Sequence, residues 1–169
     1  MELIEFGELT PQRRDELQGQ ETDPFDVGEI TVQFRGKDRH VALVDADGTA
    51  VASTGWVLGH AQVGDERFAV AGIGGVIVRP EFRGRGLGRL IVEAAVDRVR
   101  ALEAPFALLF CRPDRAGLYR RLKFTRVTAE VLVKQPRGYV VMPLETMWRP
   151  LTPGATWPEG PLTLHDLPF

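Results

Sequence analysis

The sequence predicts an α/β domain with a single mixed sheet, and three observations carry that prediction. Three β-rich runs separated by turn signals, at 40–44, 49–62 and 67–78, indicate an antiparallel meander. Apolar residues then recur at helical spacing between 87 and 102. The continuous apolar run FALLF at 106–110 is typical of a strand that is buried on both faces. Strand patterns that alternate with a helical pattern are typical of an α/β fold.

The N-terminal residues add one strand, one helix and a loop to this prediction. Residues 3–9 have a strand pattern. Thr10 can cap a helix and Pro11 suits the first helical position, so we expect a helix that runs from there to about Gly19. Residues 20–38 are expected to form a loop with at most one short helix.

The C-terminal part is predicted to hold a helix, two strands and an irregular segment. A helix is expected to open at Pro113, and the β-rich runs 124–134 and 139–144 predict two strands joined by a turn. The segment 145–169 carries five of the twelve prolines and two tryptophans. Because exposing tryptophan to water is costly, we expect this segment to pack on the domain or on a partner chain.

Length, charge and composition bound the class of protein. The 169 residues suit one domain that covers 1–169. The net charge of −2 argues against a broad nucleic-acid-binding surface, so no nucleic-acid partner is expected. The lone Cys111 excludes an internal disulfide and a cysteine-based zinc site, and the three histidines share no metal-ligand spacing, so no metal is expected. With no signal core and no apolar run of about 18 residues, we expect a cytoplasmic protein with no membrane partner.

The feature that carries chemistry is the stretch VRPEFRGRGLGRL at 78–90. A strand that enters a helix through glycines creates an anion site, because the first helical N–H groups lack acceptors and the helix dipole places positive charge there. Glycine lets the main chain approach phosphate closely, and arginine adds forked donors. Both residue types alternate through the loop: Gly84, Gly86 and Gly88 with Arg83, Arg85 and Arg89.

Two familiar phosphate loops do not fit this stretch. No Lys-Ser/Thr pair follows the last glycine, as a P-loop requires. The G-x-G-x-G spacing also lacks the acidic residue, about 20 positions further on, that completes a dinucleotide-binding unit. A solvated cationic loop remains an alternative. A nucleic-acid-binding RGG-like segment is disfavoured, because the stretch is short and runs into a helix.

The stretch 78–90 resembles the acetyl-CoA signature of the GNAT superfamily of N-acetyltransferases. The family pattern [Gln/Arg]-x-x-Gly-x-[Gly/Ala] is matched by Arg83, Gly86 and Gly88. The segment LYRRLKF at 118–124 resembles the family's tyrosine helix, and the order of strands agrees over about 40–145. The resemblance implies a GNAT-like single domain whose mostly antiparallel sheet splays between its fourth and fifth strands.

The resemblance also implies a cofactor and an activity. Acetyl-CoA would lie in the splay, with its pantetheine along the fourth strand and its pyrophosphate on the loop amides. The implied reaction is acetyl transfer by direct attack of a primary amine on a small molecule or peptide, and a homodimer is left open. The cofactor-binding residues would be Val76, Ile77, Val78, Arg83, Gly84, Arg85, Gly86, Leu87, Gly88 and Arg89.

Two further features gain roles from the resemblance. The glycines of Gly72-Ile-Gly74-Gly75 suggest a bulge in the fourth strand, against the alternative of a merely twisted strand. In the family such a bulge aims an N–H at the thioester carbonyl, where it would stabilise the oxyanion. Tyr119 matches the general acid that protonates the leaving CoA thiolate, with a core tyrosine as the alternative.

Three positions depart from the family or stay open. Lys123 stands where the family has glycine, which puts the usual turn in doubt. Cys111 could carry a covalent acetyl group, although a small packing residue is favoured. Many members carry a glutamate base where this chain has Gly74, so no base is assigned. Candidates without discrimination between them are Glu81, Asp65, His60 and Asp45.

The acceptor site implied by the resemblance is built from 20–38, 58–66 and 134–169. Acidic residues in the first segment would attract a cationic amine, although a solvated acidic loop is equally expected; they are Glu21, Asp23, Asp26 and Glu29. Two other functions stay open. Gly74-Gly75 would suit a catalytically degenerate CoA-binding protein with a regulatory or assembly role. An interaction module that uses the arginine loop is disfavoured by the net acidity.

Overall fold

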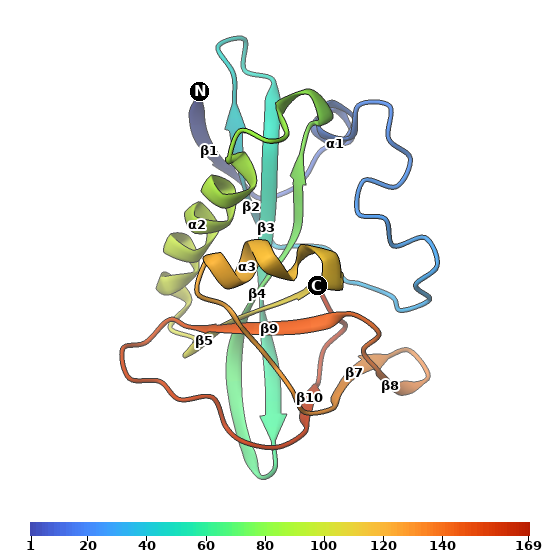
Figure 1. The fold of residues 1–169 in the computed structure, drawn as a ribbon, viewed down its shortest axis with the longest axis vertical. Coiled ribbons are helices and arrows are strands. Elements are labelled where there is room, and N and C mark those ends of the chain that lie inside the picture. The colour runs from blue at the N-terminus through green and yellow to red at the C-terminus, as the bar shows by residue number, and fades with distance from the viewer.

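The computed structural model describes residues 1–169 as a ten-stranded sheet with helices packed on both faces (Figure 1). The helices are α1 (Pro11–Gln18), α2 (Leu87–Val99) and α3 (Ala116–Arg121). The strands are β1 (Glu2–Phe6), β2 (Arg39–Val44), β3 (Ala50–Val63), β4 (Glu66–Val78), β5 (Phe106–Cys111), β6 (Thr125–Arg126), β7 (Val131–Gln135), β8 (Gly138–Val141), β9 (Glu145–Pro150) and β10 (Leu162–Leu164).

The predicted meander is confirmed. β2, β3 and β4 pair antiparallel in sequence order, and β1 pairs antiparallel with β2 at the sheet's end. The turn after β2 is closed by main-chain bonds between Asp45 and Gly48 and between Asp45 and Thr49. β3 is 14 residues long and runs the whole height of the molecule, so it connects the two halves of the sheet (Figure 1).

The predicted splay between the fourth and fifth strands is also confirmed. β4 and β5 are parallel and pair only at Val70, Ala71 and Gly72 with Phe106, Ala107 and Leu108. Beyond Gly72 the two strands separate, although β4 continues to Val78. The edge of β4 that faces β5 is therefore unpaired along its last six residues, Ile73–Val78.

The C-terminal strands differ from the prediction. Residues 124–134 are two strands, because β6 pairs with β9 at one end of the strand order while β7 pairs with β10 and β8 at the other. The segment 145–169, expected to be irregular, supplies β9 beside β5 and β10 beside β3. Pro150 is the last residue of β9 and lies beyond its pairing with β6, which reaches only Met147 and Trp148, so no hydrogen bond to β6 is lost there.

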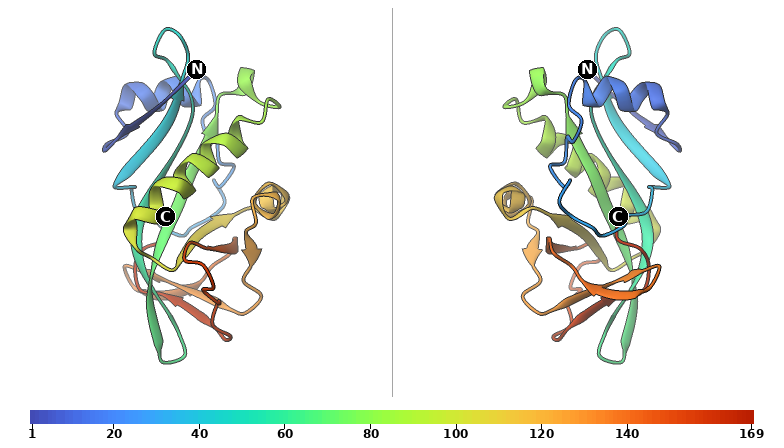
Figure 2. Two further views of the ribbon diagram at one scale, coloured as in Figure 1. Left: turned by 90° about the vertical axis from the view of Figure 1, so that its left-hand side faces the viewer. Right: turned by 90° about the vertical axis from the view of Figure 1, so that its right-hand side faces the viewer.

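Helices cover the sheet on opposite faces, and Figure 2 shows α2 along one of them. α2 buries its apolar side against Val41 and Leu43, whereas Leu17 of α1 packs with Ala42 and Val44 on the other face. The predicted cap of α1 is present, since the Thr10 hydroxyl accepts a hydrogen bond from the Arg13 N–H at 3.3 Å. None of the three helices combines the length and the apolar composition that a membrane-spanning helix needs.

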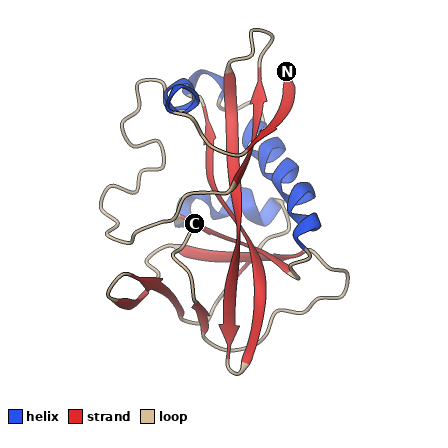
Figure 3. Cartoon of the chain, turned by 180° about the vertical axis from the view of Figure 1, so that it is seen from behind, coloured by secondary structure: helices blue, strands red, loops and turns tan.

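The segment after β9 packs within the chain. Trp148 and Trp157 stack at 5.3 Å, and both meet the Phe106 ring edge-on. Figure 3 shows the long loop between α1 and β2 returning to the sheet next to the end marked C, where the Arg35 N–H donates to the Pro168 carbonyl at 2.7 Å. The last residues thus lie against the loop that leads into β2.

Candidate active site

Two clefts meet at the middle of β4. The first, of about 340 Å³, lies between the separated ends of β4 and β5, with the glycine turn and α3 around it; we call it the splay cleft. The second, of about 480 Å³, lies on the side of the sheet that α1 covers; we call it the α1-side cleft. Gly74, Gly75, Ile77 and Phe25 line both clefts, so this part of β4 is a shared wall.

The shared wall contains the predicted bulge. Ser53 is opposite Ile77 and Gly55 is opposite Gly74, so two residues of β4 face the single residue between them on β3. Gly75 has a φ of +66°, which favours glycine. The carbonyl of Gly74 accepts a hydrogen bond from the Thr54 hydroxyl at 3.0 Å, which fixes the main chain beside the bulge.

The glycine turn after β4 has the main-chain geometry of an anion site. Gly84 and Gly86 both have a φ of +77°, and Gly86 is the N-cap of α2. From Gly84 to Arg89, none of the main-chain N–H groups donates a hydrogen bond within the chain. A row of unpaired amides at the start of a 13-residue helix is well suited to bind a phosphate group.

The three arginines of the turn are not equivalent. Both Arg83 Nη atoms donate to the Glu21 carboxylate, at 2.8 and 2.5 Å, and Arg83 Nε donates to the Val78 carbonyl at 3.0 Å. The hydrogen bond from Arg83 holds the pKa of Glu21 below its usual range. Arg85 donates to the Glu81 carbonyl, and Arg89 is exposed without a partner. Arg83 therefore ties the turn to the loop after α1, and Arg89 keeps a free guanidinium.

Tyr119 and Cys111 both line the splay cleft. Tyr119 is 8% exposed, and burial raises the pKa of its phenol, with a smaller contribution from Cys111, so the hydroxyl stays protonated at neutral pH. Burial, followed by the nearby carboxylates, raises the pKa of the Cys111 thiol to about 12. An undissociated thiol is a poor nucleophile, so the structure favours packing for Cys111.

The turn before the sixth strand is formed with lysine in place of glycine. Lys123 has a φ of +64°, and the Phe124 N–H donates to the Tyr119 carbonyl at 3.0 Å. The left-handed turn that the substitution put in doubt is therefore present. Its lysine adopts a main-chain conformation that costs a side-chain-bearing residue free energy.

The positions next to the bulge are filled by distant segments. A Cβ atom on Gly74 would lie 2.8 Å from the Phe169 carbonyl carbon and 2.9 Å from Lys37 Cε. A Cβ on Gly72 would lie 2.5 Å from the Phe169 ring. The space that a side chain at Gly74 would need is therefore taken by Phe169 and Lys37.

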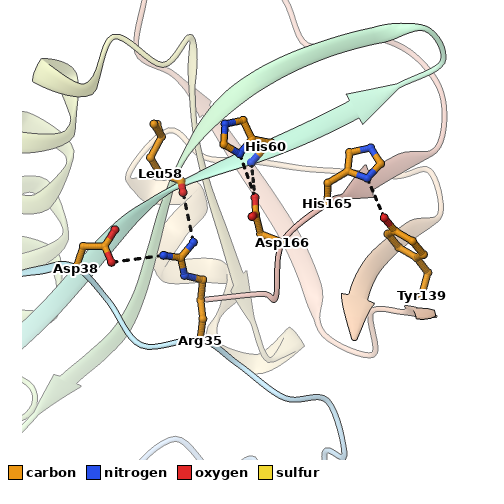
Figure 4. Close-up of polar contacts among 7 residues, drawn as sticks. All are labelled: Arg35, Asp38, Leu58, His60, Tyr139, His165 and Asp166. Carbon is orange, nitrogen blue, oxygen red and sulfur yellow. Dashed lines mark hydrogen bonds and ion pairs between the residues drawn. The ribbon is translucent and has the colours of Figure 1, made fainter. Parts of the chain in front are cut away.

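None of the bases considered from the sequence lines either cleft. Glu81 pairs with Arg79, and Asp65 and Asp45 lie in the turns at the ends of β3. His60 lies in a separate network near the C-terminal residues (Figure 4), where its main-chain N–H donates to Asp166 Oδ2 at 2.7 Å. In the same view the Tyr139 hydroxyl meets His165 Nδ1 at 2.9 Å.

The acids of the loop after α1 are mostly paired, so the acidic lining considered above is not formed. Glu21 pairs with Arg83, Asp26 with Arg112 at 2.5 Å, and Asp23 accepts from the Gly28 N–H. The single acidic residue of the α1-side cleft is Glu8.

Sequence reasoning missed two basic side chains in this cleft, His40 and Lys37. Only their position on the folded sheet reveals them, because neither lies in a recognisable motif. No group of three or more His, Cys, Asp or Glu side chains could hold a metal ion.

Comparisons with known proteins agree with this geometry. The sequence model of the acetyltransferase (GNAT) family matches residues 9–124. Two uncharacterised N-acetyltransferases named ycf52, from Pyropia yezoensis and Porphyra purpurea, are 29% and 30% identical over 70 residues, or 41% of this chain. That match spans 40% of the length of each of these relatives.

Solved structures share the fold at low identity. The GNAT-family N-acetyltransferase YhbS of Escherichia coli, solved with CoA, is similar over 96% of this chain and 89% of its own, with a TM-score of 0.61 and 18% identity. A GNAT-superfamily phosphinothricin acetyltransferase of Sinorhizobium meliloti, solved with acetyl-CoA, is similar over 94% of both chains, with a TM-score of 0.57 and 16% identity. The family match covers more than half of the sequence, and the chain belongs to the acetyltransferase (GNAT) family.

Proposed function

We propose that this protein transfers an acetyl group from acetyl-CoA to a primary amine of a small molecule or peptide. The observation that carries the proposal is the meeting of two clefts at one bulge, Gly74-Gly75. A transfer enzyme needs donor and acceptor to approach one point from separate sites. The two clefts on either side of β4 supply that arrangement.

Acetyl-CoA is assigned to the splay cleft. Its pantetheine would pair with the unpaired edge of β4 at Val76, Ile77 and Val78, where β5 has moved away. Its pyrophosphate would accept from the amides of Gly84 to Arg89, which have no acceptor in the chain. Arg83 would act by holding the turn in place through Glu21, and Arg89 would supply a free positive charge.

The reaction follows from this placement. The amine nitrogen forms a bond to the thioester carbon, and the carbonyl oxygen becomes an oxyanion that a bulge N–H can stabilise. The intermediate then breaks its carbon–sulfur bond and loses a proton from nitrogen. The protonated Tyr119 hydroxyl lines the cleft and would donate its proton to the leaving thiolate. The products are an amide and CoA, and the Tyr119 phenolate regains from solvent the proton that it gave to the thiolate.

The acceptor is assigned to the α1-side cleft, which reaches Gly74 and Gly75 from the opposite side. A second candidate function, CoA binding without catalysis, is favoured by one observation: Phe169 and Lys37 fill the space of the usual carboxylate base. The two candidates differ in turnover and agree in cofactor binding.

A calorimetric titration with acetyl-CoA, followed by thiol-release assays on a panel of primary amines, tests the proposal. We expect binding and turnover with at least one amine. Binding without turnover on the panel would select the degenerate alternative, and absence of binding would exclude both.

Replacing Tyr119 by phenylalanine tests the chemical step. We expect kcat to fall about 100-fold or more, because positioned acid catalysis is lost, while acetyl-CoA affinity is kept. The matched control is Tyr139→Phe, since Tyr139 is the only other tyrosine and lies outside the two clefts. Equal kcat values in the two variants would remove Tyr119 from the mechanism.

A further inference from the structure

Across the α1 face of the sheet, three residues stand in one row. His40 of β2 is opposite Gly55 of β3, and Gly55 is opposite Gly74 of β4. The place of a Gly55 side chain is shared by the imidazole and the stem of Lys37, since a Cβ on Gly55 would lie 2.7 Å from His40 Cδ2 and 2.6 Å from Lys37 Cγ. The His40 ring therefore extends over β3 toward the bulge where the two clefts meet.

The orientation and tautomer of this imidazole are fixed. His40 Nδ1 lies 2.7 Å from the Gly7 carbonyl oxygen, and because a carbonyl only accepts, Nδ1 carries the proton. The imidazole stacks on the Phe6 ring at 5.3 Å with an 8° interplanar angle, and the Arg13 guanidinium lies over the Phe6 ring at 4.5 Å. His40 Nε2 is thus the unprotonated nitrogen, it has no partner in the chain, and the residue lines the α1-side cleft.

The surroundings keep the ring neutral. Burial lowers the pKa of His40, the Gly7 hydrogen bond raises it, and the charge of Lys37 lowers it further. The charged groups that face the same cleft are Glu8 after β1, Arg14 of α1 and Lys37 before β2; β3 and β4 contribute none. Burial also lowers the pKa of Lys37 to about 8, and its amine makes only a long bond, 3.4 Å, to the Arg35 carbonyl.

We propose that His40 is the general base of the transfer reaction, acting from β2 in place of a carboxylate on β4. The inference rests on the proposed function. As the acceptor nitrogen bonds to the thioester carbon, its N–H becomes acidic, and Nε2 takes that proton directly or through one water. The imidazolium then returns the proton to solvent through the α1-side cleft, which is open to it, so no other reactant is needed.

The test uses the amine that the wild-type protein acetylates best and replaces His40 by asparagine. Asparagine can still donate to the Gly7 carbonyl but has no basic nitrogen. We expect kcat/KM to fall about 100-fold or more, within the usual range for a positioned base, with acetyl-CoA affinity unchanged. The matched control is His60→Asn, which alters an exposed histidine outside both clefts and should leave kcat/KM unchanged.

A pH profile separates a base from a structural residue. The ratio of wild-type to His40→Asn kcat/KM cancels the ionisation of the amine itself. Because the His40 pKa is lowered from 6.5, we expect this ratio to be constant at neutral pH and to fall as the pH drops below 6.5. Added imidazole should restore turnover in a His40→Ala variant, which a packing role would not permit.

The outcomes are distinguishable. If the wild-type protein binds acetyl-CoA but acetylates no amine, the proposed function fails and the base assignment fails with it. If the wild-type protein turns over and His40→Asn matches it, only the base assignment fails. If the pH-dependent ratio appears instead for Lys37→Met and not for His40→Asn, Lys37 is the base and the proposal is overturned.

Discussion

The two clefts differ in how the residues that line them are distributed along the sequence. About half of the residues that line the splay cleft come from one continuous stretch, between Ile73 and Gly88, in which glycine permits the turns and the bulge. The α1-side cleft is lined by residues from the segment after β1, from α1, from the loop between α1 and β2, and from the sheet itself. Main-chain sites leave glycines at fixed spacing in the sequence, whereas side-chain sites assembled from distant segments leave no spacing to find.

If the sheet beside the α1-side cleft needs glycine because there is no space for a side chain, adding a side chain there should lower the stability of the protein more than any other change below. In Gly72→Ala the new methyl group would lie 2.5 Å from the Phe169 ring. We expect the free energy of unfolding to fall by roughly 1–3 kcal/mol, the usual range for overpacking, as measured by urea denaturation. The loss should shrink in a Phe169→Leu background, and an equal loss in both backgrounds would contradict the proposed clash.

If the splay cleft depends on the main-chain conformation that glycine allows, replacing Gly86 by a β-branched residue should weaken the binding of acetyl-CoA. Its φ of +77° is unfavourable for valine, and the exposed turn can relax to relieve that strain. Restoring the binding geometry would then cost about 2 kcal/mol, so the Kd for acetyl-CoA should rise roughly 30-fold in calorimetry. Gly48→Val is the control: its φ is +80° in the turn after β2, and it should alter stability alone.

The α1-side cleft also contains Lys37, a charged residue whose burial lowers the stability of the folded protein. Lys37→Met keeps the alkyl stem and removes the amine, so we expect the free energy of unfolding at pH 7 to rise by about 1–2 kcal/mol. Burial lowers the folded-state pKa of Lys37 from 10.5 to about 8. Wild-type stability should therefore recover as the pH rises from about 8 to 10.5, and the advantage of the variant should shrink over that window. A constant advantage would mean that charge is not the cause.

The smallest effect is expected at Lys123, which holds a left-handed turn beside the splay cleft without glycine. Its φ is +64°, so Lys123→Gly should raise the melting temperature, with a gain of about 0.5–1 kcal/mol in the free energy of unfolding. Acetyl-CoA affinity should be unchanged, because the side chain does not line the splay cleft. A lower melting temperature would show that the lysine side chain contributes more than its strain costs.

The same contrast decides how far the sequence could predict the molecule. The meander, α2, the buried β5 and the glycine turn all follow local patterns, and each was predicted near its observed bounds. β9 and β10 were missed because prolines suggested an irregular segment, whereas pairing with β5 and β3 decides their structure. His40 was missed because a lone histidine in a strand has no signal until Gly55 and Gly74 stand beside it.

The ion pairs of the loop after α1 are a second feature that the sequence could not predict. Glu21 and Asp26 were candidates for attracting a cationic amine, but their partners Arg83 and Arg112 lie 62 and 86 residues away. Pairing at such separations depends on the fold, and no local rule predicts it. Ion pairs of this kind remove acids from a candidate site, so composition alone overstates the charge of a cleft.

The bulge at Gly75 changes which residues of β4 face α1 and which face α2. Before it, Ala71 and Ile73 turn toward α2; after it, Val76 and Val78 turn toward α2 and Ile77 toward α1. The one extra residue thus inverts the alternation of faces within a single strand. Deleting it would exchange the two faces of everything downstream and turn the apolar side chains that α2 covers toward α1. One strand therefore follows two successive alternation patterns, and the proposed point of chemistry lies at the residue where one pattern changes to the other.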